Sequence, residues 1–281
     1  MNKFLPLITL FVAAFMMSTC SPPGIPAQST VSTLPPTNVT YSPPSTPTLP
    51  LANVTCNELT FYLDPALGNG YDCETVPERS NSDLPEGMSY VFIYPTHTEL
   101  TIQHYPLTHT QFPPQIWIYP VSRFSELLPN IIPPLVYDLE RLITGSTWSR
   151  GELPFLPFNP QIQSFVIHET GISFNGGQGV RFITEYTDGP SPISNLNIIY
   201  TFQGLTDNEM YWVAVTFPIS NPILPADYDT LPEGYTQESL ILNYSSYVSD
   251  VKYALEAQAP GSFSPTIEIL DSLVNSITVS Q

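Results

Sequence analysis

The sequence predicts an α+β fold, in which a central antiparallel sheet is sandwiched between helices in an α/β/α arrangement. Three observations favour this fold: β-rich runs joined by short turns over residues 163–217, helical spacing of apolar residues before and after that region, and one strand that is apolar on both faces. A signal peptide and a disordered stalk rich in proline, serine and threonine are expected to precede the domain.

Residues 1–19 have the composition of an export signal. Lys3 is their only charged residue, and the apolar stretch that follows is shorter than the about 20 residues that a membrane-crossing helix needs. The segment runs into Met17-Ser18-Thr19-Cys20, which resembles the bacterial lipobox. The resemblance implies a lipoprotein whose Cys20 is diacylated and anchored in the cell membrane, facing the extracytoplasmic side. An ordinary cleaved signal, in which Cys20 has no such role, is the alternative.

Residues 20–55 form the predicted linker. Between Ser21 and Thr55 the chain has nine prolines and twelve serines or threonines, and apolar residues show no period. Because proline fixes φ and favours an extended, semi-rigid chain, the linker is expected to hold the following domain away from its anchor.

Residues 56–281 are predicted to form one domain, because no second proline-rich linker and no internal repeat interrupts them. Cys56 and Cys73 are an even pair in an exported chain, and a disulfide between them is expected to stabilise the domain by about 3 kcal/mol. A metal site, the competing interpretation, needs more soft ligands than two distant cysteines provide.

Eight strands are expected from runs rich in β-branched and aromatic residues. Turn signals at 175–178, 188–190 and 206–208 join the last four into an antiparallel meander over 163–217. The expected strands are Leu59–Leu63, Ser89–Tyr94, Glu99–His104, Gln115–Val121, Gln163–Phe174, Gly179–Tyr186, Leu196–Gln203 and Met210–Phe217.

Helices are expected before and after the meander. Two prolines suit the first turn of a helix over 133–143. Apolar residues recur at helical spacing over 244–255 and again over 263–277, where Ser264-Pro265 provides a capping hydroxyl and a proline for the first turn. Since the strand Met210–Phe217 is apolar on both faces, helices are expected to cover both sides of the sheet.

Three segments resemble the closing strands and last helix of PsbP-like domains: Tyr200–Leu205, Met210–Phe217 followed by Pro218, and Leu270–Ile277. PsbP-like domains are α/β/α sandwiches on a central antiparallel sheet, some are lipid-anchored, and most are non-enzymatic accessory subunits. The resemblance implies the same fold for this chain, and no particular partner.

The charge of the chain excludes nucleic acid as a main partner. The sequence has 25 acidic residues against 7 basic ones, a formal net charge of −18. Too few cations are present to neutralise many phosphates or to adsorb the domain to anionic lipid. Attachment to the membrane is therefore expected only through the N-terminal lipid.

The sequence predicts no catalytic residue, no metal ligand and no cofactor. It has no G-x-S-x-G motif, and the glycines at 176–179 lie between two expected strands instead of opening a helix. His97 and Glu99 share a strand face that His104 does not, so these side chains do not converge on a zinc ion.

One polar face is the candidate ligand site. Arg181 and Glu185 share a side of one strand, and Asn197 and Gln203 share a side of the next. If the hairpin register brings these four side chains together, they form a polar patch on an otherwise apolar sheet. The alternative is a solvent-exposed sheet end with a cross-strand ion pair.

The leading functional hypothesis is a lipid-anchored extracytoplasmic protein with a non-enzymatic domain for interaction with another protein or a cell-envelope component. An exported hydrolase that uses paired carboxylates around Glu185 is the first alternative, and it requires a carboxyl whose pKa is raised by burial. A carrier of a small ligand is the second alternative, and it requires an aromatic-lined void.

Overall fold

The structure is a computed structural model that describes residues 50–85, 89–145 and 152–280. The described residues all belong to the unit Thr48–Gln281, the second of two into which the chain divides. The predicted signal peptide, Cys20 and most of the predicted linker lie outside the described residues. Within those residues, no helix is long and apolar enough to cross a membrane.

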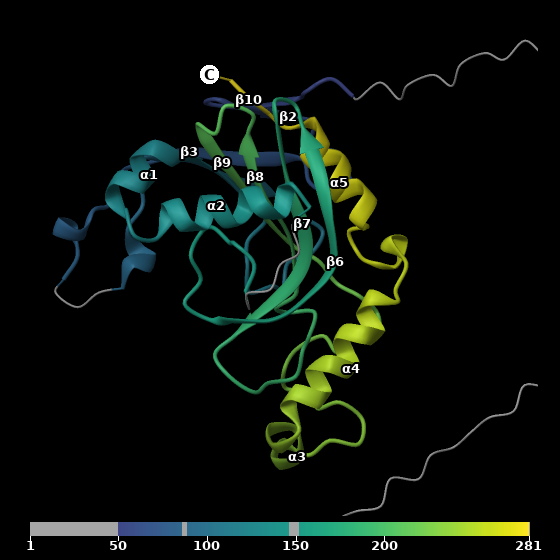
Figure 1. The fold of residues 1–281 in the computed structure, drawn as a ribbon. Coiled ribbons are helices and arrows are strands. Elements are labelled where there is room, and N and C mark those ends of the chain that lie inside the picture. The colour runs from purple at the N-terminus through teal and green to yellow at the C-terminus, as the bar shows by residue number, and fades with distance from the viewer. Residues whose placement is uncertain (1–49, 86–88, 146–151, 281) are drawn as a thin grey trace, which may run out of the picture. The chain divides into compact units, whose positions relative to one another are not determined.

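The second unit is α+β, as expected, and is built on a seven-stranded sheet (Figure 1). Every neighbouring pair of strands is antiparallel, and the last four strands form the expected meander. In spatial order the strands are β3 (Gly70–Val76), β4 (His97–Gln103), β5 (Gln115–Pro120), β9 (Tyr211–Pro218), β8 (Ile199–Thr206), β7 (Gly177–Thr187) and β6 (Ile162–Phe174).

A smaller antiparallel sheet joins the two ends of this unit. It consists of β1 (Val54–Cys56), β2 (Leu59–Phe61) and β10 (Thr278–Val279), with β2 in the centre. The first strand therefore includes the last two residues that composition assigned to the linker. The predicted disulfide Cys56–Cys73 is present and ties β1 to β3, so it links the two sheets.

Two helices cover one face of the large sheet, namely α1 (Val121–Leu127) and α2 (Ile132–Ile143). Trp117 and Trp212 are buried on this face in one cluster with Leu139 of α2. The helix expected over 133–143 is thus confirmed, and Figure 1 shows it lying across the strands.

Three helices belong to the opposite side: α3 (Gln237–Leu242), α4 (Tyr244–Glu256) and α5 (Ile267–Ser276). Val215, whose side chain points away from Trp212, is buried with Leu270 of α5 in the main core cluster. The apolar character of both faces of β9 therefore matches the presence of helices on both sides.

Two local expectations are wrong. Ser89–Tyr94 is not a strand, because the Ser89 hydroxyl accepts a hydrogen bond from the Val91 N–H and caps a 3₁₀ turn. Ser264 does not cap the last helix, since its N–H donates to the Ser220 carbonyl, and Thr266 caps α5 instead. The 3₁₀ turns are η1 (Asn81–Asp83), η2 (Tyr90–Phe92) and η3 (Pro260–Ser262).

Candidate functional site

The register of β7 and β8 separates the predicted ligand face into two parts. Arg181 pairs with Phe202, and Gln203 pairs with Val180. Since directly paired side chains point to the same face, Arg181 and Glu185 face α4 and α5, whereas Gln203 faces α2. The expectation that Arg181, Glu185, Asn197 and Gln203 form one patch is therefore wrong.

Arg181 connects the sheet to α5. Its guanidinium forms an ion pair with Asp271 at 3.1 Å and also donates to the carbonyl of His168. The Tyr200 hydroxyl donates to the same Asp271 carboxylate at 2.9 Å. The partner of Arg181 is therefore Asp271 on α5 and not Glu185. The guanidinium holds α5 and β6 against the sheet.

Gln203 fastens an irregular segment to the α2 side of the sheet. Its side-chain oxygen accepts from the Leu156 N–H at 3.0 Å and from the Trp212 indole N–H at 2.8 Å. Its side-chain nitrogen donates to the Leu156 carbonyl and to the Thr201 hydroxyl, each at 3.0 Å. The amide is fully used inside the protein, so Gln203 has a structural role.

Glu185 and Asn197 are the two predicted site residues that lie together. Asn197 belongs to a turn before β8 and not to the strand, and its amide donates to Glu185 Oε1 at 3.5 Å. Glu185 is 0% exposed, and burial raises its pKa to about 8, with only partial compensation from Ser164 and Asn197. Its other oxygen, Oε2, has no hydrogen-bond partner among the described residues.

A β-bulge in β6 places Ser164 beside this carboxyl. Gln163 pairs with Tyr186 and Phe165 pairs with Glu185, so Ser164 has no partner on β7. Such a bulge adds one residue to one strand and changes where its side chains point. The strand was predicted from its composition, but the bulge was not.

A pocket of about 500 Å³ lies between the β6 edge and α4, next to Glu185. We call it the α4 pocket. It is lined by Ile162, Gln163, Ser164, Phe165, Thr187, Gly189, Pro190, Tyr244, Ser245, Val248, Ser249 and Lys252.

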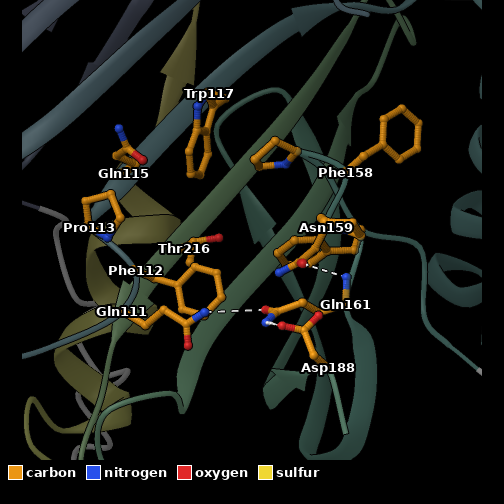
Figure 2. Close-up of a pocket in the computed structure, with 13 residues that line it drawn as sticks. Gln111, Phe112, Pro113, Gln115, Trp117, Phe158, Asn159, Gln161, Asp188 and Thr216 are labelled. Carbon is orange, nitrogen blue, oxygen red and sulfur yellow. Dashed lines mark hydrogen bonds between the residues drawn. The ribbon is translucent and has the colours of Figure 1, made fainter. Parts of the chain in front are cut away.

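A second pocket, of about 440 Å³, lies on the α2 side of the sheet (Figure 2). We call it the amide pocket, because three glutamines and one asparagine face it together with three prolines and four aromatic residues. It is lined by Gln111, Phe112, Pro113, Gln115, Trp117, Phe155, Pro157, Phe158, Asn159, Pro160, Gln161, Asp188 and Thr216.

The amides of this pocket are held by one another. Gln161 accepts from Gln111 at 3.4 Å and donates to Asp188 at 3.0 Å, and its own backbone N–H donates to Asn159 at 2.9 Å. Figure 2 shows these contacts along one side of the pocket, with the aromatic ring of Phe112 beside them and the ring of Phe158 farther away.

Glu99 holds two other lining residues of the amide pocket, Gln115 and Trp117, in place. Its two oxygens accept from Gln115 at 2.6 Å and from the Trp117 indole at 3.0 Å, so both lining side chains have fixed orientations. Burial raises the pKa of Glu99, while the bond from Trp117 lowers it and the nearby Glu74 raises it. Thr216, only 2% exposed, lines the same pocket with a hydroxyl that has no partner among the described residues.

Sequence reasoning missed the amide pocket because most of its residues are in loops. Gln111 and Phe112 precede β5, the stretch 155–161 precedes β6, and Asp188 follows β7. The one available signal was the unusual run Phe155-Leu156-Pro157-Phe158-Asn159-Pro160, in which aromatic and amide side chains alternate with proline.

The described ranges contain no group of three or more His, Cys, Asp or Glu side chains arranged to hold a metal ion. Comparison of the sequence and structure with protein-family models, curated proteins and solved structures finds no match. The lipobox and PsbP-like resemblances therefore stay predictions.

Proposed function

We propose that this chain is an exported, lipid-anchored binding protein whose domain captures a neutral, hydroxyl-rich ligand, such as a carbohydrate of the cell envelope, in the amide pocket. The observation that carries the proposal is the set of amide side chains held beside aromatic rings in one pocket. The activity is binding and not catalysis.

Side-chain amides both donate and accept hydrogen bonds, as sugar hydroxyls do, and aromatic rings pack against the apolar faces of sugar rings. Among the described lining residues Asp188 is the only charged one, and it already accepts a bond from Gln161. The unpartnered hydroxyl of Thr216 offers one further polar contact. This chemistry favours a neutral ligand over an anion or a cation.

The location of the protein rests on its N-terminal sequence. A signal peptide over 1–19, a lipid on Cys20 and a linker over 20–55 would display the domain on the extracytoplasmic side, within reach of envelope carbohydrate. Mass spectrometry of the mature N-terminus tests this part, and an unmodified residue 20 would refute the lipid anchor.

The binding proposal is tested by calorimetry with a panel of neutral oligosaccharides and a matched anionic panel. We expect the neutral panel to contain ligands, and Gln161→Ala to weaken their binding about tenfold, because this side chain connects the amides of the pocket. Gln237→Ala, at an exposed glutamine on α3, is the matched control and should bind as the wild type does. Absence of neutral ligands, or equal binding by Gln161→Ala, would contradict the proposal.

The alternative of an exported hydrolase has one supporting observation, the raised pKa of buried Glu185. A paired-carboxylate mechanism needs a second acid close by. No acidic group of the described residues is among those that shift the pKa of Glu185. The geometry therefore supports binding better than this type of catalysis.

A further inference from the structure

Among the described residues, four buried polar atoms that have no hydrogen bond of normal geometry lie around Glu185. They are Glu185 Oε2, Asn197 Oδ1, Ser164 Oγ and the Tyr244 hydroxyl. Asn197 and Ser164 both lower the pKa of Glu185 through hydrogen bonds. Ser164 also lowers the pKa of Tyr244, and the charge of Glu185 raises it. Buried polar groups are nearly always paired in native proteins, so four neighbouring exceptions indicate a missing partner.

The α4 pocket gives access to this cluster. Ser164 and Tyr244 line it, and Glu185 lies behind them on the strand paired with Ser164's neighbour, Phe165. The remaining wall includes Phe165, Pro190 and Val248, which are apolar. The wall also contains polar residues, namely Gln163, Thr187, Ser245, Ser249 and Lys252, so the pocket is partly apolar and its end toward Glu185 is polar.

We propose that the α4 pocket binds a ligand with a single primary ammonium group, whose three N–H bonds are shared among four acceptors: Glu185, Asn197 and the hydroxyls of Ser164 and Tyr244. An ammonium group has three donors and no acceptor, and each of these four groups can accept. The apolar remainder of the ligand lies against Phe165 and Val248.

The charges around the cluster favour a cation as the partner. A buried carboxylate is stable only when it is paired, and Arg181, the cation on the same strand face, is already bound to Asp271. An anion would be repelled by Glu185 once this carboxyl is ionised, whereas a cation stabilises the ionised form. Lys252 lines the pocket and disfavours a second positive charge on the ligand, which restricts the ligand to one ammonium group.

The titratable groups near Glu185 define the expected pH dependence. Tyr244 and Tyr247 on α4 have pKa values raised above 10 and stay neutral below pH 9. Lys252 lines the pocket, and Arg181 is paired with Asp271. Glu185 is therefore the group that changes charge between pH 6 and pH 8, and it has to lose its proton to accept the ammonium.

The experiment measures binding of n-hexylamine and of the uncharged hexan-1-ol to the full chain by calorimetry at pH 6, 7 and 8. We expect the amine to bind more tightly than the alcohol. Its affinity should rise by up to about tenfold per pH unit, while the affinity for the alcohol should not rise. Heats measured in two buffers of different ionisation enthalpy should show close to one proton released per amine bound at pH 7.

Three variants complete the test. Glu185→Gln should weaken amine binding by at least about tenfold and abolish proton release, and Tyr244→Phe should weaken it by about threefold with proton release retained. Glu268→Gln, at an exposed acid on α5, is the control and should bind as the wild type does. Equal affinity for amine and alcohol, or unchanged amine binding by both pocket variants, would overturn the proposal.

Discussion

Glu99 and Glu185 are glutamates on opposite faces of the same sheet, and their surroundings differ. Both oxygens of Glu99 accept side-chain hydrogen bonds, from Gln115 and Trp117. Glu185 is more deeply buried, yet its bond from Asn197 is long, at 3.5 Å, and its Oε2 has no hydrogen bond of normal geometry among the described residues. Glu99 therefore belongs to a complete hydrogen-bond network, whereas the network of Glu185 is incomplete. This difference favours the α4 side of the sheet as the place where a charged group of a ligand binds.

The largest effect is expected from Glu185→Gln on stability. Between pH 4.5, the ordinary pKa of the side chain, and about 8, its pKa in the folded state, the unfolded chain ionises and the folded chain does not. The wild type therefore loses about 1.4 kcal/mol of stability per pH unit across this interval, and the loss ends above pH 8. The stability of Glu185→Gln does not change in this way, because glutamine does not ionise.

Urea unfolding of both proteins at pH 4, 6 and 8 measures this difference. The variant and the wild type should be similar at pH 4, and the variant should be more stable by about 3 kcal/mol or more at pH 8. A difference that does not depend on pH would show that Glu185 is ionised in the folded protein, and the contrast with Glu99 would then be lost.

Glu99→Gln is expected to lower the free energy of unfolding, in contrast to Glu185→Gln, which raises it. An amide in place of this carboxylate can accept from only one of Gln115 and Trp117, so at least one buried donor loses its partner. We expect a loss of about 1 kcal/mol in unfolding free energy at pH 7. Urea unfolding at pH 7 with Glu126→Gln, an exposed acid, as control measures it. If Glu99→Gln stabilised the protein instead, its network would be as incomplete as that of Glu185.

The parts of the fold that follow from local chemistry could be predicted. Turn residues between β-rich runs predicted the meander of β6 to β9, and the even number of cysteines remaining in an exported chain predicted Cys56–Cys73. The strand β3 was not expected, because Gly68 and Asn69 before it indicate a turn. Its pairing with β4 also depends on contacts between residues that are distant in sequence.

The candidate sites could be predicted only in part, because they depend on register. A shift of one residue reverses the face of every side chain, and nothing in the sequence specified that Arg181 pairs with Phe202. Asn197 reaches Glu185 because it lies in a turn, where strand alternation does not apply. The amide pocket is assembled from loops whose positions are set by tertiary contacts such as those of Gln203 with Leu156.

The smallest effect is expected from Ser164→Ala, and it tests whether the α4 network is incomplete. The Ser164 hydroxyl has no hydrogen bond of normal geometry among the described residues, so its removal takes away only weak bonds to Glu185 and Tyr244. The free energy of unfolding should therefore stay within about 0.5 kcal/mol of the wild type. Thr201→Ala is the matched control, because the Thr201 hydroxyl donates to the Val215 carbonyl at 2.7 Å and its loss should cost about 1 kcal/mol. If both variants lost the same stability, Ser164 would have a partner in the folded protein, and the site around Glu185 would already be complete without a ligand.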